Sequence, residues 1–222
     1  MSPAVQFDAK THTYFVGGRW APGCTRILGD VGYLKGAAWF TEESRVRGTQ
    51  AHLACAMADQ YAPDATDLDA VLDVIEVGDA LIPYLQGYLL FRRETGYRPV
   101  WSEQLMYMES PLVCGTPDSW GHYGDGRRVL CDLKSWKGQG PNPKRAAVLQ
   151  TAGYALMVKE RTGETTDLRV IVALPGDGRY RAYECRDPRD ESLFLCAAHL
   201  WHDRFAHKLI EGSDRGEVEI GE

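Results

Sequence analysis

Long apolar runs are missing from the sequence. The best candidate for a membrane segment, Leu81 to Phe91, contains Pro83 and is shorter than the roughly 20 apolar residues that a spanning helix needs. The first residues, Met1 to Asp8, lack the basic start and apolar stretch of a secretory signal. We therefore expect no membrane contact and a cytoplasmic location.

Cysteine pairs at metal-ligand spacing are also missing. The six cysteines are scattered, and no Cys-x-x-Cys occurs. This pattern argues against a zinc ribbon and against a compact disulfide framework. Cys114 and Cys131 lie in apolar runs, so we expect the cysteines to be small, buried side chains.

The sequence also has no excess of basic residues over acidic ones. The formal net charge is −6 at pH 7, which argues against a protein that coats DNA regardless of its sequence. It does not argue against a metal-dependent enzyme, because bound cations reverse the field around acidic groups. Affinity for DNA depends on where the basic groups lie rather than on their total.

The chain does contain enough for one well-packed domain: 222 residues, 44% hydrophobic and 25% charged, with no internal repeat. Periodicity and turn residues predict first a hairpin over Val5–Trp20 that turns at Gly17-Gly18, then a short helix near Thr25–Leu28 and longer helices over Thr41–Tyr61 and Asp67–Thr95, the last bent or broken near Pro83. Three strands follow, over Val100–Met108, Leu112–His122 and Val129–Ser135. The rest of the chain is predicted to form a helix over Lys144–Arg161, strands over Leu168–Leu174 and Tyr180–Glu184, and a helix over Pro188–Ile210. This order predicts one α/β domain with a central mixed β-sheet flanked by helices. Its parts would be an N-terminal hairpin and helices (1–97), a core (98–185), a C-terminal helix (186–211) and a frayed tail (212–222).

Two acids and a lysine stand out within the predicted core. Asp118 ends the segment Gly-Thr-Pro-Asp, and Asp132 and Lys134 follow the apolar run Val-Leu-Cys. Residues i and i+2 of a strand face the same side, so Asp132 and Lys134 project together. The turn sequence Gly124-Asp125-Gly126 would fold Asp118 back beside them. Two such carboxylates are costly to bury without a cation, and hard oxygen ligands suit Mg²⁺ or Mn²⁺.

Phosphodiester hydrolysis uses this combination of groups. A metal acidifies a water molecule and stabilises the charge that develops on the phosphate, while a neighbouring lysine orients the water or contacts the phosphate oxygens. Asp-x-Lys alone is a common pattern, and a second copy, Asp8-Ala9-Lys10, is typical of a turn. A surface hairpin with a solvated Asp–Lys pair is the competing interpretation.

Two flanking helices carry further motifs. Gly48-Thr49-Gln50-Ala51-His52 precedes the acids, and Gln150-Thr151-Ala152-Gly153-Tyr154 follows them. With the hairpin, they resemble the RecB-like branch of the PD-(D/E)XK nucleases, which includes phage exonucleases and the mitochondrial genome maintenance exonuclease. That branch is marked by Gly-Thr-x-x-His, Gly-x-x-Asp, (Asp/Glu)-x-Lys and Gln-x-x-x-Tyr in this order. The resemblance runs from about Phe7 to Leu174, and Asp132 departs from it in standing where Glu is more usual.

The resemblance implies a restriction-endonuclease-like core and a role for each matching residue. Asp118, Asp132 and the backbone carbonyl of Leu133 would ligate the metal, with His52 as a further ligand and Lys134 as the catalytic lysine. The small residues Gly48 and Thr49 would let the helix approach the sheet and bring His52 towards the metal.

Supporting roles are implied for three further residues. Glu103 would support the metal shell through water, and Gln150 and Tyr154 would shape the site or hold the DNA backbone. Five basic residues are candidates for phosphate contacts: Arg45, Arg47, Lys137, Lys144 and Arg145. A merely solvated loop around Lys137 is an equal alternative. His199, His202 and His207 have no third ligand at a convincing spacing, and we expect them on a polar helix face. His12 and His122 are expected to be structural.

The function that the resemblance implies is that of a Mg²⁺- or Mn²⁺-dependent DNA exonuclease in phage-type recombination, replication or repair. Its setting would be a bacterial or phage-infected cell, with DNA and a single-strand annealing or recombination protein as partners. A structure-specific or sequence-specific endonuclease and a non-catalytic DNA-binding module are the alternatives. Some relatives hold an iron–sulfur cluster with four cysteines, but Cys185 and Cys196 lack that grouping, so no cluster is expected. Polarity, strand preference and homo-oligomer formation stay open.

Overall fold

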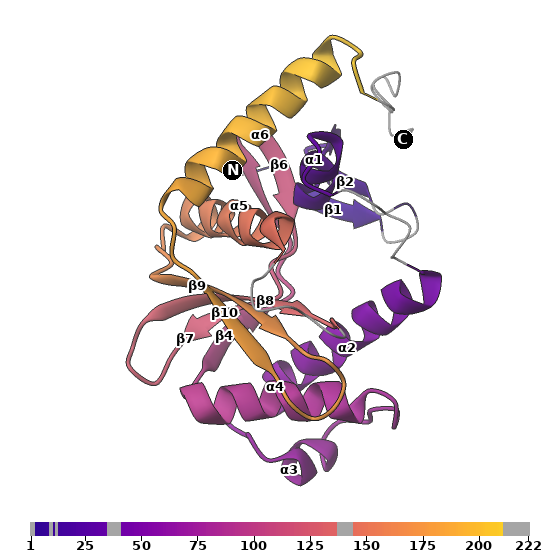
Figure 1. Cartoon of the computed structure of the whole chain (residues 1–222), viewed down its shortest axis with the longest axis vertical. Helices are drawn as coiled ribbons and strands as arrows, with labels where there is room; N and C mark the ends of the chain where they lie inside the picture. Colours follow the sequence, from indigo (N-terminus) through magenta and orange to yellow (C-terminus); the bar gives the residue numbers. More distant parts are fainter. Residues whose placement is uncertain (1–2, 9–10, 12, 35–40, 137–143, 211–222) are drawn as a thin grey trace.

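The computed structural model describes residues 3–8, 11, 13–34, 41–136 and 144–210 (Figure 1). The helices are α1 (Cys24–Asp30), α2 (Glu42–Tyr61), α3 (Leu68–Leu72), α4 (Ile82–Thr95), α5 (Arg145–Thr162) and α6 (Arg189–Ala206). The strands are β1 (Val5–Asp8), β2 (Thr13–Val16), β3 (Arg19–Ala21), β4 (Arg98–Ser102), β5 (Met106–Glu109), β6 (Leu112–Gly115), β7 (Ser119–His122), β8 (Arg128–Lys134), β9 (Leu168–Ala173) and β10 (Arg181–Cys185).

The central sheet has five strands in the order β10-β9-β8-β7-β4. Strands β8 and β9 run parallel and are connected through α5, whereas the other neighbouring pairs are antiparallel. Strands β1, β2 and β3 form a separate small sheet, and β5 and β6 form another. Figure 1 shows α5 and α6 on one side of the central sheet and α2, α3 and α4 on the other. The predicted mixed sheet flanked by helices is confirmed.

Alternation along β8 separates two layers of the core. Val129, Cys131 and Leu133 pack with residues of α2 and α4, whereas Leu130 packs with residues of α5 and α6. Because side chains of a strand alternate between its faces, Asp132 and Lys134 share the face of Leu130, towards α5. The end of β8 therefore presents polar groups where α5 borders the sheet.

The predicted strands Val100–Met108 and Leu112–His122 are wrong, because each is two strands in different sheets. The chain leaves the central sheet after β4, where Glu103 adopts a left-handed conformation with φ of 52° that an extended strand does not allow. It forms the β5–β6 hairpin and returns to the central sheet at β7. The two crossings between the sheets, residues 103–105 and 116–118, lie side by side, because the Glu103 N–H donates to the Asp118 carbonyl over 2.9 Å.

The long helix predicted over Asp67–Thr95 is also two helices, α3 and α4. The Asp67 side chain caps α3 by accepting from the backbone of Asp69 and Ala70. Pro83 lies in the first turn of α4, where its missing N–H would have no helical partner, so it starts the helix instead of bending it. The predicted helix end at Ile210 is likewise wrong, because α6 ends at Ala206.

Other predictions from short sequence patterns agree with the structure. The Thr41 side chain caps α2 by accepting from the Ser44 N–H over 3.1 Å, as the sequence predicts. The Gly17-Gly18 turn joins β2 to β3. Five cysteines are buried as expected, but Cys196 is exposed, so the expectation of burial is wrong there. None of the helices in the described part of the chain is long and apolar enough to cross a membrane.

Close packing of α5 on α6 generates a first prediction. A Cβ at Gly153 would lie 2.5 Å from the fully buried ring of Phe194. We expect Gly153→Ala to lower the free energy of unfolding by about 1–3 kcal/mol, because overpacking outweighs the gain in helix propensity. Gly78→Ala is the matched control, because a Cβ there meets open space. Chemical denaturation measures both, and equal unfolding free energies for the two variants would contradict the packing shown.

Candidate metal centre

Three side chains from three segments converge at the crossings between the sheets. His52 comes from α2, Glu103 follows β4, and Asp118 precedes β7. One potential ligand atom from each lies within 4.8 Å of those of the other two. The His52 Nδ1 is 3.3 Å from the Asp118 Oδ1. Asp118 is buried, His52 is half-buried and Glu103 is exposed.

Strand register and a small residue on α2 explain this convergence. Ser102 pairs with Ser119 in the β4–β7 ladder, so Glu103 and Asp118 are the next residues outward on each strand. A Cβ at Gly48 would lie 3.2 Å from the Ser135 Oγ, at the end of β8. The helix thus approaches the sheet closely at Gly48, one turn before His52, as the sequence argument requires.

Electrostatics at this group fit a divalent cation. Desolvation by neighbouring protein atoms, followed by the Asp118 charge, raises the pKa of Glu103 to about 8, although Glu103 as a whole is exposed. Burial opposes ionisation of Asp118, but His52, Lys134 and the Leu133 N–H outweigh it and lower the pKa of Asp118. One imidazole and two carboxylates are suitable ligands for a divalent cation, so these three residues could hold one.

Asp132, which is buried, and Lys134, which is half-buried, form an ion pair beside this group. The Lys134 Nζ lies 2.9 Å from the Oδ1 and 2.7 Å from the Oδ2 of Asp132, and only the Oδ1 contact has hydrogen-bond geometry. Burial, and next to it the Asp118 charge, raise the pKa of Asp132 to about 6, against the influence of Lys134. Burial opposes the charge on Lys134, but Asp132 and Asp118 outweigh it and raise the pKa of Lys134.

The backbone of β8 connects the pair to Asp118. The Leu133 N–H donates to the Asp118 Oδ2 over 2.6 Å, so the predicted motif residues do meet. Asp132 does not belong to the three-residue donor group, whereas Glu103, expected to act only through water, does. That Asp132 and the Leu133 carbonyl ligate a metal stays a prediction.

On α5, Gln150 and Tyr154 interact with each other. The Gln150 Nε2 donates to the Tyr154 hydroxyl over 2.8 Å. A Cβ at Gly115 would lie 2.5 Å from the Tyr154 ring, which explains why glycine opens the segment that leads to Asp118. Burial, followed by the nearby Cys24 and Asp132, raises the pKa of Tyr154 well above its ordinary value. Tyr154 is therefore held in its neutral form and is bonded to Gln150.

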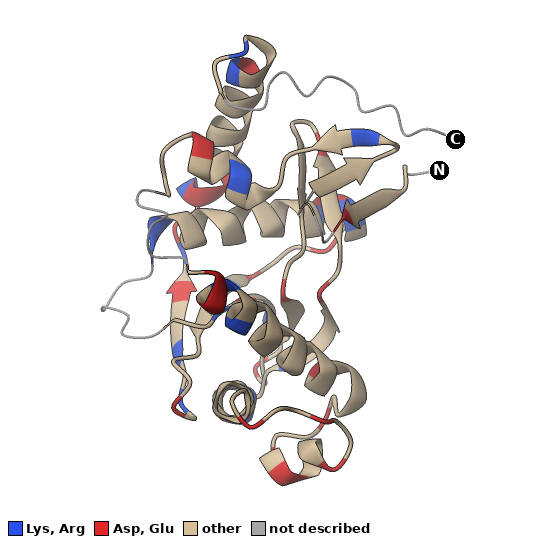
Figure 2. Ribbon diagram, turned by 90° about the vertical axis from the view of Figure 1, so that its right-hand side faces the viewer, with Lys and Arg blue, Asp and Glu red and all other residues tan. Residues whose placement is uncertain are grey.

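The basic candidates for DNA contact are engaged within the protein. The described members contact other side chains: Arg45 with Glu42, Arg47 with Glu43, Arg145 with Asp190, and Lys144 with the face of Trp136. Lys137 and His12 lie outside the described residues. Lys and Arg are spread over several elements in Figure 2 and do not form one stripe. Contact of these residues with DNA stays a prediction.

Among the histidines set aside by the sequence, His202 and His122 have partners that fix their positions. A ring nitrogen of His202 lies 2.7 Å from the Leu112 carbonyl oxygen and connects α6 to β6. His122 contacts the Trp120 ring edge-on at a centroid distance of 5.4 Å.

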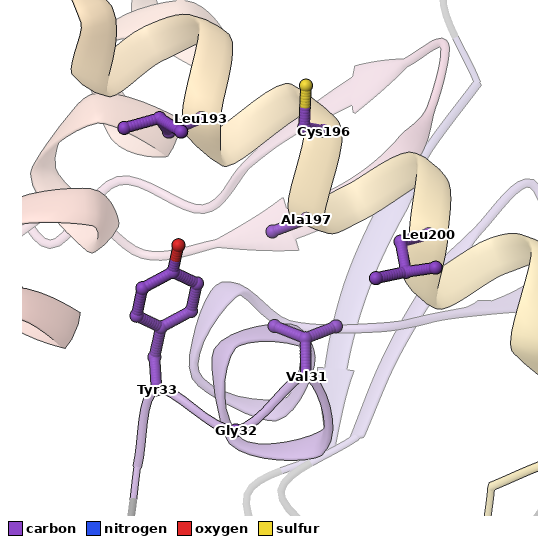
Figure 3. Close-up of a pocket in the computed structure, with 7 residues that line it drawn as sticks. All are labelled: Val31, Gly32, Tyr33, Leu193, Cys196, Ala197 and Leu200. Carbon is purple, nitrogen blue, oxygen red and sulfur yellow. The ribbon is translucent and has the colours of Figure 1, made fainter.

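A pocket of about 280 Å³ lies between α6 and the segment after α1. Figure 3 shows the side chains of Val31 and Tyr33 on one side and those of Leu193, Ala197 and Leu200 on the other. Its seven lining residues include the thiol of Cys196 and the hydroxyl of Tyr33 but no carboxylate, imidazole or amine, so the acids, imidazole and lysine discussed above have no counterpart there.

Sequence reasoning missed a polar group behind the donor set. Asp59 is buried on α2 and accepts hydrogen bonds from Tyr88 and Ser102 and, at 3.4 Å, from Ser119. Its spacing of seven residues from His52 was the available signal, because positions i and i+7 share a helix face.

Comparison with known proteins gives no family for this chain. No family model matches, and no curated protein matches. Among solved structures, an alkaline exonuclease (LHK-Exo) from Laribacter hongkongensis is similar at 17% identity and a TM-score of 0.36, with 87% of this chain and 95% of that chain covered. A protein described as SSO0001 is similar at 12% identity and a TM-score of 0.36, with 81% of this chain and 83% of that chain covered. At such low TM-scores these similarities carry no argument about function.

The donor group generates a prediction about metal binding. We expect Mn²⁺ at about 100 times its dissociation constant to stabilise the protein by about 2.7 kcal/mol, because it binds the folded state only. Asp118→Asn and Glu103→Gln should each remove most of this gain. Asp64→Asn is the matched control, because Asp64 lies in an exposed ion pair with Arg98. Thermal unfolding with and without Mn²⁺ measures the effect, and full stabilisation of the Asp118 variant would exclude the site.

Proposed function

We propose that this protein is a metal-dependent DNA exonuclease of the RecB-like PD-(D/E)XK type. The observation that carries the proposal is the position of Asp118 between two groups. Its Oδ1 approaches His52 in the donor set, and its Oδ2 accepts from the backbone of the strand that carries Asp132 and Lys134. Acids, imidazole and lysine are thus combined as phosphodiester hydrolysis requires.

A divalent cation bound by His52, Glu103 and Asp118, with Asp132 as a further acid, would supply an activated water and stabilise charge on the phosphate. Lys134 is held in its charged form by Asp132 and Asp118. An ammonium group in this position would contact the scissile phosphate or orient the attacking water. The buried position of Asp132 fixes the lysine, because a buried charge needs its partner.

DNA is the proposed substrate, and action at its ends is the proposed mode. Both rest on the resemblance of the four sequence motifs, in their order, to those of the RecB-like nucleases. The geometry adds that Gln150 and Tyr154 stand together on α5, on the same side of the sheet as Asp132. From there they would border the DNA backbone.

Digestion of DNA tests this function. We expect linear DNA to be degraded with Mg²⁺ or Mn²⁺ and circular DNA to stay intact. Asp118→Asn and Lys134→Gln should each lower the rate by about 100-fold or more, as loss of a charge-stabilising group does. Asp8→Asn is the matched control, because Asp8 belongs to the other Asp-x-Lys copy and bonds locally to Thr11.

Each result has a separate meaning. Cleavage of closed circular DNA at a comparable rate would assign an endonuclease with the same site. Intact DNA in all forms, or an Asp118 variant as active as the unmodified protein, would refute nuclease activity.

A further inference from the structure

Asp59 is the centre of a buried hydrogen-bonded cluster beneath the candidate metal centre. The Tyr88 hydroxyl donates to its carboxylate at 2.8–2.9 Å, and the Arg92 guanidinium lies 3.3 Å from its Oδ1. The Ser102 hydroxyl donates to its Oδ2, and the Ser119 hydroxyl approaches the same oxygen at 3.4 Å. Both charged members, Asp59 and Arg92, are buried.

The cluster contacts each segment that carries a candidate metal ligand. Asp59 itself lies on α2, two turns after His52. Ser102 is the last residue of β4 and immediately precedes Glu103, and Ser119 is the first residue of β7 and immediately follows Asp118. The Asp59 carboxylate therefore bonds to the ends of β4 and β7, next to the candidate ligands Glu103 and Asp118. Asp59 lies on α2, the helix that also carries the third candidate ligand, His52.

Further bonds fix the same two serines. The Ser102 Oγ lies 3.3 Å from the Ser119 Oγ, and the Tyr97 hydroxyl lies 2.8 Å from the Ser119 Oγ. With both serines bonded to Asp59, α2 cannot slide along the strands without breaking several buried hydrogen bonds. Buried polar groups that lose their partners cost about 1–3 kcal/mol each, so the arrangement strongly prefers one register.

A general contribution to stability accounts poorly for this cluster. A buried ion pair contributes little net stability, because the desolvation of both charges offsets their attraction. Apolar residues of similar size could fill the same space. Bonds from one acid to the residues flanking two candidate ligands instead define distances between those ligands.

We propose that Asp59 is a positioning residue for the metal centre, which holds His52 in register with Glu103 and Asp118 through its bonds to Ser102 and Ser119. The inference rests on the proposed metal-dependent function. It predicts that metal affinity depends on the hydroxyl groups of Ser102 and Ser119, which bond to Asp59 and are not among the candidate ligands. Residues that orient metal ligands typically change affinity by 10–100-fold when they are removed.

The test uses variants that keep the Asp59–Arg92 charges together, because an unpaired buried charge could prevent folding. Mn²⁺ binding to the full-length protein is measured by isothermal titration calorimetry, beside the thermal midpoint without metal. We expect Ser102→Ala to weaken Mn²⁺ binding by roughly tenfold. Ser102→Thr, which keeps the hydroxyl, should restore the affinity to within about twofold of the unmodified protein.

Tyr88→Phe is the matched control. It removes a hydroxyl bonded to the same carboxylate, but from α4, which supplies no candidate ligand. It should lower the thermal midpoint about as much as Ser102→Ala and leave Mn²⁺ affinity within about twofold, because the serine bonds to Asp59 remain.

The outcomes separate the two levels of the proposal. Unchanged Mn²⁺ affinity in Ser102→Ala, or an equal loss in Tyr88→Phe, overturns the positioning role while the metal centre stands. Failure of Ser102→Thr to recover affinity overturns it as well. If the unmodified protein binds no Mn²⁺, the metal-dependent function fails, and the positioning role fails with it.

Discussion

The Asp118 carboxylate accepts the Leu133 N–H over 2.6 Å and lies 3.3 Å from the His52 Nδ1, and the rest of the site is arranged around these two contacts. Burial alone would raise the pKa of this acid, yet its neighbours keep it ionised. That ionised group then acts on others, since it contributes to the raised pKa values of Glu103 and Asp132. The fold supplies the neighbours that keep Asp118 ionised by bringing α2 and the two crossings between the sheets to one place.

Local chemistry in the sequence was sufficient where short-range rules decide the structure. Alternation in β8 placed Asp132 and Lys134 on one side, and their ion pair follows from that spacing. The breaks in the strand predictions had a different cause. Glu103 takes a positive φ without being glycine, because the pairing of β4 with β7 and the start of a second sheet determine its backbone. No turn residue near Glu103 indicates such a break. The local pattern therefore predicts one continuous strand, whereas long-range pairing divides it into two.

The same distinction explains the candidate site. His52, Asp118 and Lys134 were predictable because motif order and strand geometry bring them together. The closeness of Glu103 to Asp118 was not, since it depends on the Ser102–Ser119 pairing across 17 positions of sequence. The ion pairs of the basic residues show the same difference between local and long-range contacts. The Arg45–Glu42 pair is readable from helix spacing, whereas Arg145 meets Asp190 across 45 positions.

Charge balance connects the donor group to the ion pair beside it. Lys134 compensates Asp132 directly, so the charge that still needs a partner lies on Asp118 and Glu103. Asp118 raises the pKa of His52 against the effect of burial and also contributes to the raised pKa of Glu103. A divalent ion bound by these residues would compete with protons for the same atoms, because coordination requires deprotonated ligands. Lys134 would keep its own proton and charge during such an exchange, because Asp132 and Asp118 raise its pKa. The site would then combine one fixed cation with one exchangeable cation.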